Sequence, residues 1–159
     1  MIVLGVAIGA LNGRSPEVSQ AFLDWSERAV MSVALPLAGM FTMMLGVMRL
    51  VEQGRLDLDR PLRDAVPDAG IDNPWDDVAP VTLGQVLEHT AGLDDMRFNE
   101  TFTPDDAMTP TAALAINPRS RRIRWRPGSR PAYSNVGYTL AARAIEHATG
   151  EPFDTWLRR

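Results

Sequence analysis

The sequence of 159 residues contains neither cysteine nor lysine, so its 16 basic residues are all arginine. Without cysteine the chain forms no disulfide and no thiolate metal site. Without lysine it offers no amine side chain as a nucleophile or as a partner that activates one. Two histidines, His89 and His147, are too few for a histidine-based metal cluster. No carboxylate spacing suggests another kind of metal site, so we expect no metal and no cofactor.

Positive charge is also in short supply overall, because the formal net charge is −4. This acidic balance argues against a nucleic-acid partner. Six of the arginines nevertheless gather between residues 119 and 130, where they alternate with Ile123 and Trp125. The alternation predicts a short strand with one face in water. Two interpretations remain open for the arginines, an anion-binding patch or a solvated edge offset by nearby acids, and the overall charge favours the second.

A run without any charged residue extends from Ala29 to Met48. About 20 apolar residues suffice to span a bilayer, although Pro36 and Gly39 weaken this run. A membrane helix and a buried core helix remain alternatives, and in either case the run is expected to be shielded from water. We therefore expect two domains: a hydrophobic helical segment over residues 1–53, as a membrane anchor in the first alternative, and a helical domain over 54–159.

The remaining local signals predict a mainly α protein. Thr82 and Gln85 have the spacing of a capping box at the start of a helix. A second, short helix is expected over residues 107–116. The last long helix should begin near Asn135 as its N-cap and end at Gly150.

From about residue 50 onward the chain resembles a known superfamily. The stretches "LVEQGRLDLDRPL", "VTLGQVLEHTAGL" and "PGSRPAYSNVGYTLAARAIEHATGEPF" are similar, in this order, to serine β-lactamases and penicillin-binding proteins, above all to the class C β-lactamase, esterase and D-aminopeptidase branch. The resemblance implies the helical subdomain of the β-lactamase/transpeptidase-like fold, lacking most of its antiparallel sheet. It also implies a β-lactam or a peptide-like small molecule as ligand, and a membrane-associated or extracytoplasmic location rather than a cytoplasmic one.

The resemblance places two candidate site residues in the segment 133–135, which matches the family's Tyr-x-Asn element. It implies proton transfer by Tyr133 and a polar anchor in Asn135. The competing interpretation, which we favour, is a helix-starting turn in which Asn135 caps the helix and Tyr133 packs its ring. His89, within "EHTAGL", matches a family loop position and is expected to hydrogen-bond that loop.

The family's Ser-x-x-Lys motif, which supplies the nucleophile, is missing from this sequence. Its serine and lysine would fall at Leu37 and Met40, or one residue earlier at Pro36 and Gly39. The family's C-terminal Lys-or-His-x-Gly strand would lie beyond Arg159. No nucleophile is therefore expected, and the chain is interpreted as a truncated, inactive relative of serine hydrolases. The alternative is a membrane-anchored or interaction module without catalysis.

Residues 1–53 carry a second resemblance. The stretch "AVMSVALPLAGMFTMMLGVMRLVEQG" is similar to the membrane-embedded gate region of spore maturation protein A. A natural fusion, a fragment and an artificial chimera would each combine the two resemblances in one chain.

Overall fold

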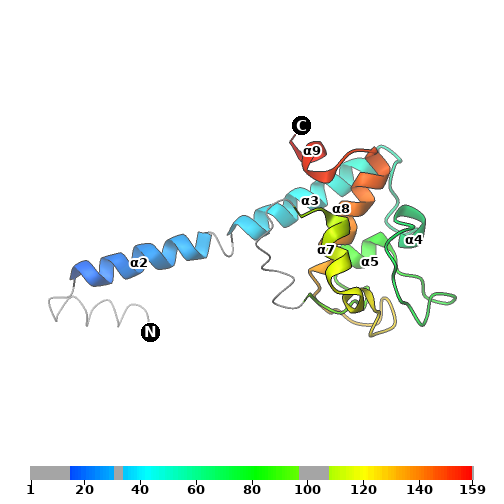
Figure 1. The fold of residues 1–159 in the computed structure, drawn as a ribbon, viewed down its shortest axis with the longest axis horizontal. Coiled ribbons are helices and arrows are strands. Elements are labelled where there is room, and N and C mark those ends of the chain that lie inside the picture. Colours follow the sequence, from blue (N-terminus) through cyan, green and yellow to red (C-terminus); the bar gives the residue numbers. More distant parts are fainter. Residues whose placement is uncertain (1–14, 31–33, 97–107, 159) are drawn as a thin grey trace. The chain divides into compact units, whose positions relative to one another are not determined.

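The computed structural model of the chain describes residues 15–30, 34–96 and 108–158. Its contacts divide the chain into two compact units, with the boundary in the sequence between Phe41 and Thr42. The first unit contains α2 (Ser15–Ala29) and the beginning of α3 (Leu35–Glu52), and all later elements belong to the second (Figure 1). The division expected after residue 53 stays a prediction.

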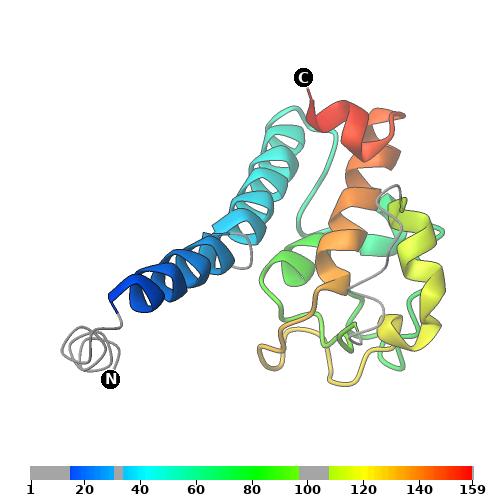
Figure 2. The same ribbon diagram turned by 60° about the vertical axis from the view of Figure 1, so that its left-hand side comes forward.

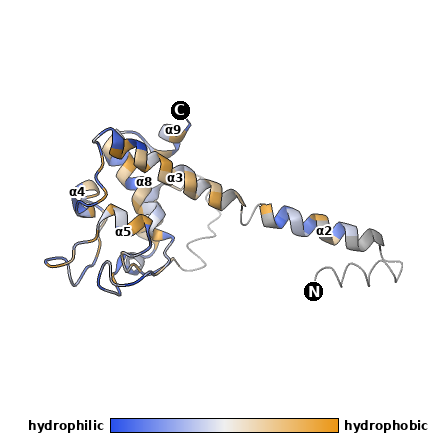
Figure 3. Ribbon diagram, turned by 180° about the vertical axis from the view of Figure 1, so that it is seen from behind, coloured by the Kyte–Doolittle hydropathy of each residue, from blue (hydrophilic) through white to orange (hydrophobic). Residues whose placement is uncertain are grey.

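The part of α3 in the second unit has one buried and one exposed face. Met43 and Val47 are buried, with 9% and 0% of their surface exposed, whereas Leu45 is 70% exposed. Hydrophobic residues nevertheless extend along the helix, in contrast to the mixed character of α2 (Figure 3). This part of the run is therefore not a fully buried core helix. Among the described residues, no helix is long and apolar enough to cross a membrane.

The core of the second unit is built around α8 (Val136–Thr149). Its apolar stripe repeats at helical spacing and is inaccessible to solvent at Leu140, Ala141, Ala144 and Ile145. This helix packs against α4 (Leu62–Ala65), α5 (Leu83–Leu87), α7 (Pro110–Ile116) and α9 (Phe153–Leu157). Figure 2 shows α8 with α5 on one side and α7 on the other. Gly150 ends it in the left-handed conformation, as its sequence position predicts.

The predicted capping box at the start of α5 is confirmed. Thr82 Oγ1 accepts a hydrogen bond of 3.2 Å from the Gln85 backbone N–H, and Gln85 Oε1 accepts one of 3.1 Å from the Thr82 N–H. Leu83 and Val86 turn inward and are buried. The helix is short, and α7 is short as well. Thr109 caps α7, so the expected helix is present from residue 110 onward, while residue 107 lies outside the described residues.

The strand expected in the arginine-rich segment is reduced to single bridges. A 3₁₀ turn, η2 (Pro118–Arg121), is followed by isolated bridges from Arg122 to Asp72 and from Ile123 to Leu93. The parts of the chain that the structure describes contain no strand longer than such a bridge. Ile123 is buried in the core, with 2% of its surface exposed. The inward direction expected for this residue is thus found, although the expected strand is not.

Candidate functional site

The Tyr-x-Asn turn, residues 133–135, lies directly before α8 and is held from the loop that follows α5. Tyr133 Oη donates a hydrogen bond of 2.9 Å to Asn135 Oδ1. The Tyr133 ring lies against the His89 imidazole, with 4.5 Å between ring centroids and a tilt of 39°. Tyr133 is still 53% exposed, so its phenol faces solvent as well as this contact. The expected ring packing is thus found on one face only.

Asn135 occupies the N-cap position of α8 but does not cap it with its side chain, so that prediction is wrong. Its backbone adopts helical angles, and no side-chain hydrogen bond closes the first turn. The side chain is instead engaged by Asp95, whose Oδ1 lies 2.7 Å from the Asn135 backbone N and 3.2 Å from Nδ2. The Asn135 Oδ1, the atom that would accept from the helix amides in a cap, accepts from Tyr133 Oη instead, while Asp95 holds the Nδ2 amide.

Ser134, between the two candidate residues, is buried and occupied. Only 2% of its surface is exposed, and its Oγ donates a hydrogen bond of 2.8 Å to the Asp94 carbonyl oxygen. A serine nucleophile needs an exposed hydroxyl with a base in reach. The ring of His89 is close, but its Nδ1 accepts from the Ser134 backbone N–H, at 3.4 Å, and not from the hydroxyl. Ser134 is therefore a structural side chain.

His89 and Tyr138 complete the polar cluster below the turn. The His89 Nε2 and the Tyr138 Oη lie 3.1 Å apart, and the two rings meet edge to face. Burial lowers the pKa of His89, and the negative charge of Asp95 opposes this shift in part. Burial raises the pKa of Tyr138, and the neighbouring Tyr133 adds to that effect. Both groups are therefore neutral near pH 7.

Arginines approach the site from the segment before the turn. The Arg130 guanidinium lies 4.1 Å from the centre of the Trp125 ring, and that of Arg124 lies 5.5 Å from it. Arg124 also forms an ion pair of 2.9 Å with Asp94. Arg122 pairs with Asp72 at 3.7 Å. Acids and an aromatic ring thus engage these arginines, in agreement with a solvated edge.

The structure brings together more residues than the sequence singled out. Tyr133, Asn135 and His89 were candidates and lie in one cluster. Asp95 and Tyr138 were missed. Tyr138 follows Asn135 by three residues, which places it one turn into the helix and could have been noticed. Asp95 is 40 residues away from Asn135 in the sequence, and no local pattern indicates the contact.

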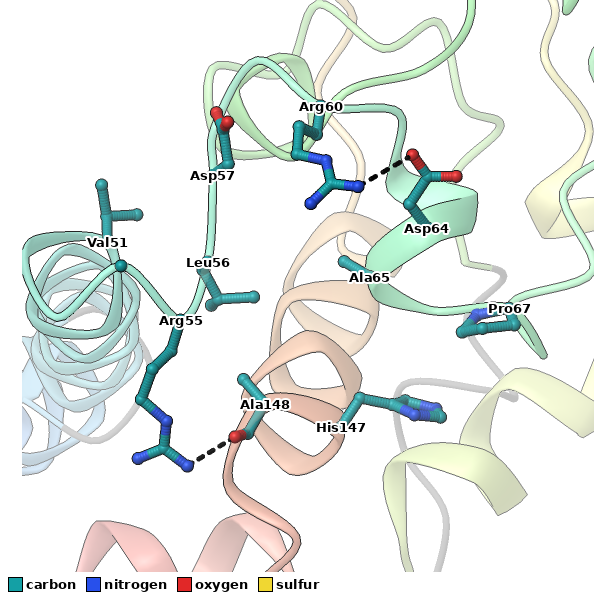
Figure 4. A pocket seen from close by; sticks show the side chains of 11 residues that line it. Val51, Arg55, Leu56, Asp57, Arg60, Asp64, Ala65, Pro67, His147 and Ala148 are labelled. Atoms are coloured by element: carbon teal, nitrogen blue, oxygen red, sulfur yellow. Dashed lines mark hydrogen bonds and ion pairs between the residues drawn. The ribbon is translucent and has the colours of Figure 1, made fainter.

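A pocket of about 620 Å³ lies on the second unit, between the segment after α3 and the end of α8 (Figure 4). Its charged side chains are already engaged in part: Arg55 donates to the Ala148 carbonyl oxygen at 2.5 Å, and Arg60 lies 3.8 Å from Asp64. None of the Tyr-x-Asn turn, His89 or Tyr138 lines it. In the described residues, no group of histidine and acidic side chains is arranged to hold a metal ion.

Residues 40–159 match the family model described as Beta-lactamase. The chain belongs to the β-lactamase family. The matched residues include the whole second unit and its Tyr-x-Asn turn. The resemblance to serine β-lactamases and penicillin-binding proteins that the sequence suggested is therefore confirmed. The resemblance of residues 1–53 to spore maturation protein A stays a prediction.

Individual members of the β-lactamase family are moderately similar to this chain. The D-alanyl-D-alanine-carboxypeptidase/endopeptidase AmpH of Escherichia coli (strain K12) is 29% identical over 108 residues, 67% of this chain and 28% of AmpH. The octameric penicillin-binding protein homologue from Pyrococcus abyssi superposes with a TM-score of 0.60 and 27% identity, over 75% of this chain and 28% of that one. D-amino acid amidase from Ochrobactrum anthropi SV3 superposes with a TM-score of 0.57 and 31% identity, over 75% and 38%.

The chain spans little more than a quarter of the curated relatives it matches, 27% and 28% of their lengths. The match establishes the β-lactamase-related hydrolase family, and the described residues of this chain are mainly helical.

Proposed function

We propose that this chain is a non-catalytic member of the β-lactamase family, which retains the Tyr-x-Asn turn without a nucleophile. The observation that carries the proposal is the pair of residues where the family has serine and lysine. Leu37 and Met40 stand there, or Pro36 and Gly39 in the neighbouring register, and the chain has no lysine at any other position. Neither register supplies a hydroxyl, so the covalent route has no starting atom.

The state of the turn supports the same proposal. Ser134, the serine of the turn, is buried and its hydroxyl donates to the Asp94 carbonyl oxygen. The oxygen of Asn135 accepts from Tyr133, and its amide donates to Asp95. A proton-transferring tyrosine needs a cation to stabilise its anion. The arginine nearest in sequence, Arg130, stacks on Trp125 instead.

The ligand expected from the resemblance, a β-lactam or a peptide-like small molecule, would then bind without a covalent bond. Fluorescent penicillin labelling, together with hydrolysis of a chromogenic cephalosporin and a short-chain nitrophenyl ester, tests the proposal. The predicted outcome is no labelled band and no turnover above a heat-denatured sample. An active class C β-lactamase serves as the positive control. Stoichiometric labelling that survives denaturation would overturn the proposal.

A second candidate, an interaction module without catalysis, is favoured by the exposed face of α3 in the second unit. Leu45 is 70% exposed, and Met44 and Met48 are 39% and 42% exposed on the same helix. Large apolar side chains gathered on one helix are typical of association surfaces. The second candidate adds to the first a self-association surface on α3, and light scattering across a concentration series tests it. Association that disappears in Leu45→Glu would favour this addition, and a concentration-independent monomer would contradict it.

A further inference from the structure

His89 has a backbone conformation that is uncommon for a residue other than glycine. Its φ is +59°, and it is the one residue other than glycine with a positive φ in ranges 15–30, 34–96 and 108–158. The left-handed region is unfavourable for a side chain with a Cβ, and such residues persist where the surrounding structure holds them. A strained residue of this kind next to a family motif indicates that the side chain has a task there.

Four contacts of His89 reach the Tyr-x-Asn turn and the residues that flank it. Its carbonyl oxygen accepts from the Ala132 N–H at 2.7 Å, and its Nδ1 accepts from the Ser134 N–H at 3.4 Å. Its ring lies against that of Tyr133, at 4.5 Å between centroids. Its Nε2 lies 3.1 Å from the Tyr138 hydroxyl. The residues before, at and after the phenol-bearing Tyr133 are thus all bound by one side chain and its backbone.

These contacts fix the tautomer of the imidazole. A backbone N–H can only donate, so the Nδ1 that faces Ser134 must carry a lone pair. The ring proton then resides on Nε2, which donates to the Tyr138 oxygen. The titratable groups that face the ring are Tyr133, Tyr138 and Asp95, and the Coulombic effect of Asp95 on the pKa of His89 opposes that of burial.

We propose that His89 is the positioning residue of the Tyr-x-Asn turn, and that it positions Tyr133 only as the neutral imidazole protonated on Nε2. The proposal rests on the proposed function in one respect, the assignment of Tyr133 and Asn135 as the retained element of the site. Protonation of His89 would place a second N–H opposite the Ser134 N–H. That hydrogen bond would be lost, and the backbone at Ser134 would lose its ring acceptor, while the Asp94 and Asp95 hydrogen bonds would still attach the turn to the loop.

Nuclear magnetic resonance of the full chain tests this directly, because the sequence has only two histidines and two tyrosines. With labelled histidine and tyrosine, Tyr133→Phe and His147→Asn assign the signals. The expected result at neutral pH is a His89 ring protonated on Nε2. As the pH falls, the ring signals of Tyr133 and the Ser134 amide should shift with the midpoint of His89. A ring protonated on Nδ1, or Tyr133 signals that ignore the His89 titration, would overturn the proposal.

Two substitutions separate positioning from simple packing. Asparagine tolerates positive φ, and its Oδ1 can replace the Nδ1 acceptor. In His89→Asn the Ser134 amide should keep its hydrogen-exchange protection. In His89→Leu it should exchange about five- to tenfold faster, as expected for one lost hydrogen bond. Equal protection in both folded variants would contradict the proposal. If His89→Leu does not fold, the wild-type titration decides alone.

The outcome is independent of the test of the proposed function. Penicillin labelling can succeed or fail without changing the tautomer of His89. A wrong tautomer would leave the absence of a nucleophile untouched.

Discussion

Asn135 and Asp95 are joined by three hydrogen bonds across 40 residues of sequence. The Asp95 carboxylate accepts from the Asn135 backbone N–H at 2.7 Å and from its side-chain amide at 3.2 and 3.4 Å. It also accepts from the Met96 N–H at 2.8 Å. The first turn of the central helix α8 is thereby attached to the loop after α5. This contact holds the amide nitrogen of the Asn135 side chain, and Tyr133 Oη donates to its oxygen, so no atom of the side chain caps the helix.

Removal of the carboxylate should therefore destabilise the second unit. We expect Asp95→Ala to lower the free energy of unfolding by about 1–3 kcal/mol, because partly buried donors on Asn135 lose a charged acceptor. Asp72→Ala is the matched control. It removes a carboxylate whose ion pair with Arg122 is exposed and 3.7 Å long, and should cost less than about 0.5 kcal/mol. Urea midpoints measure both. Equal costs for the two variants would show that the Asp95 contacts contribute nothing special.

Gly92 should tolerate no side chain. Its φ is +79°, and a Cβ would overlap the Trp125 carbonyl oxygen, which belongs to backbone that cannot move aside easily. Gly150→Ala is a matched control, because φ is +76° there and the space around it is open. We expect the control to cost about 1 kcal/mol, the penalty of the left-handed backbone, and Gly92→Ala to cost clearly more. Thermal unfolding compares the two, and similar melting temperatures would refute the predicted clash.

Tyr133 should contribute more through its ring than through its hydroxyl. Tyr133→Phe loses one exposed hydrogen bond to Asn135, worth about 1 kcal/mol or less. Tyr133→Ala also loses the contact with His89, worth a further ~0.5–1.5 kcal/mol. Chemical denaturation of both variants tests this order. A phenylalanine variant as unstable as the alanine variant would place the stabilisation in the hydroxyl.

The stability of the second unit should depend on pH through His89. Because burial lowers the pKa of His89, the unfolded chain binds the proton more readily than the folded one. The contribution of neutral His89 to the free energy of unfolding is complete above the ordinary histidine pKa of about 6.5. It is lost as the pH falls through the lower pKa that His89 has in the folded protein. Urea midpoints between pH 7.5 and 5 should fall in the wild type and fall less in His89→Asn. An identical slope in the two proteins would contradict this assignment.

The sequence predicted those features that neighbouring residues decide. Thr82 and Gln85 are three residues apart, so their capping box was visible without any knowledge of the fold. Gly150 after the apolar stripe of α8 was equally informative. The site depends on contacts between residues that are far apart in the sequence. Asn135 has the residue type and position of a helix cap, but Asp95 binds its amide nitrogen from a distant loop and Tyr133 donates to its oxygen. The left-handed backbone of His89 likewise accompanies contacts with Ala132, Tyr133, Ser134 and Tyr138, which the residues next to His89 in the sequence do not reveal.

The prediction for the arginine-rich segment, residues 119–130, was correct in part. Alternation correctly indicated that Ile123 points inward, and it is almost fully buried. It also predicted a strand, but among the described residues Ile123 and Arg122 find only single bridge partners, Leu93 and Asp72. A strand needs a neighbouring strand to pair with, and periodicity within one segment carries no information about its partner.

The most direct test of the central claim is the intact mass of the protein after incubation with benzylpenicillin. A serine nucleophile would open the β-lactam ring and keep the whole molecule as an ester, which adds one penicillin mass to the chain. We predict an unchanged mass for the wild type and for Ser134→Ala, alongside complete acylation of an active penicillin-binding protein treated in the same way. A one-to-one adduct that peptide mapping assigns to any serine of this chain would contradict the account.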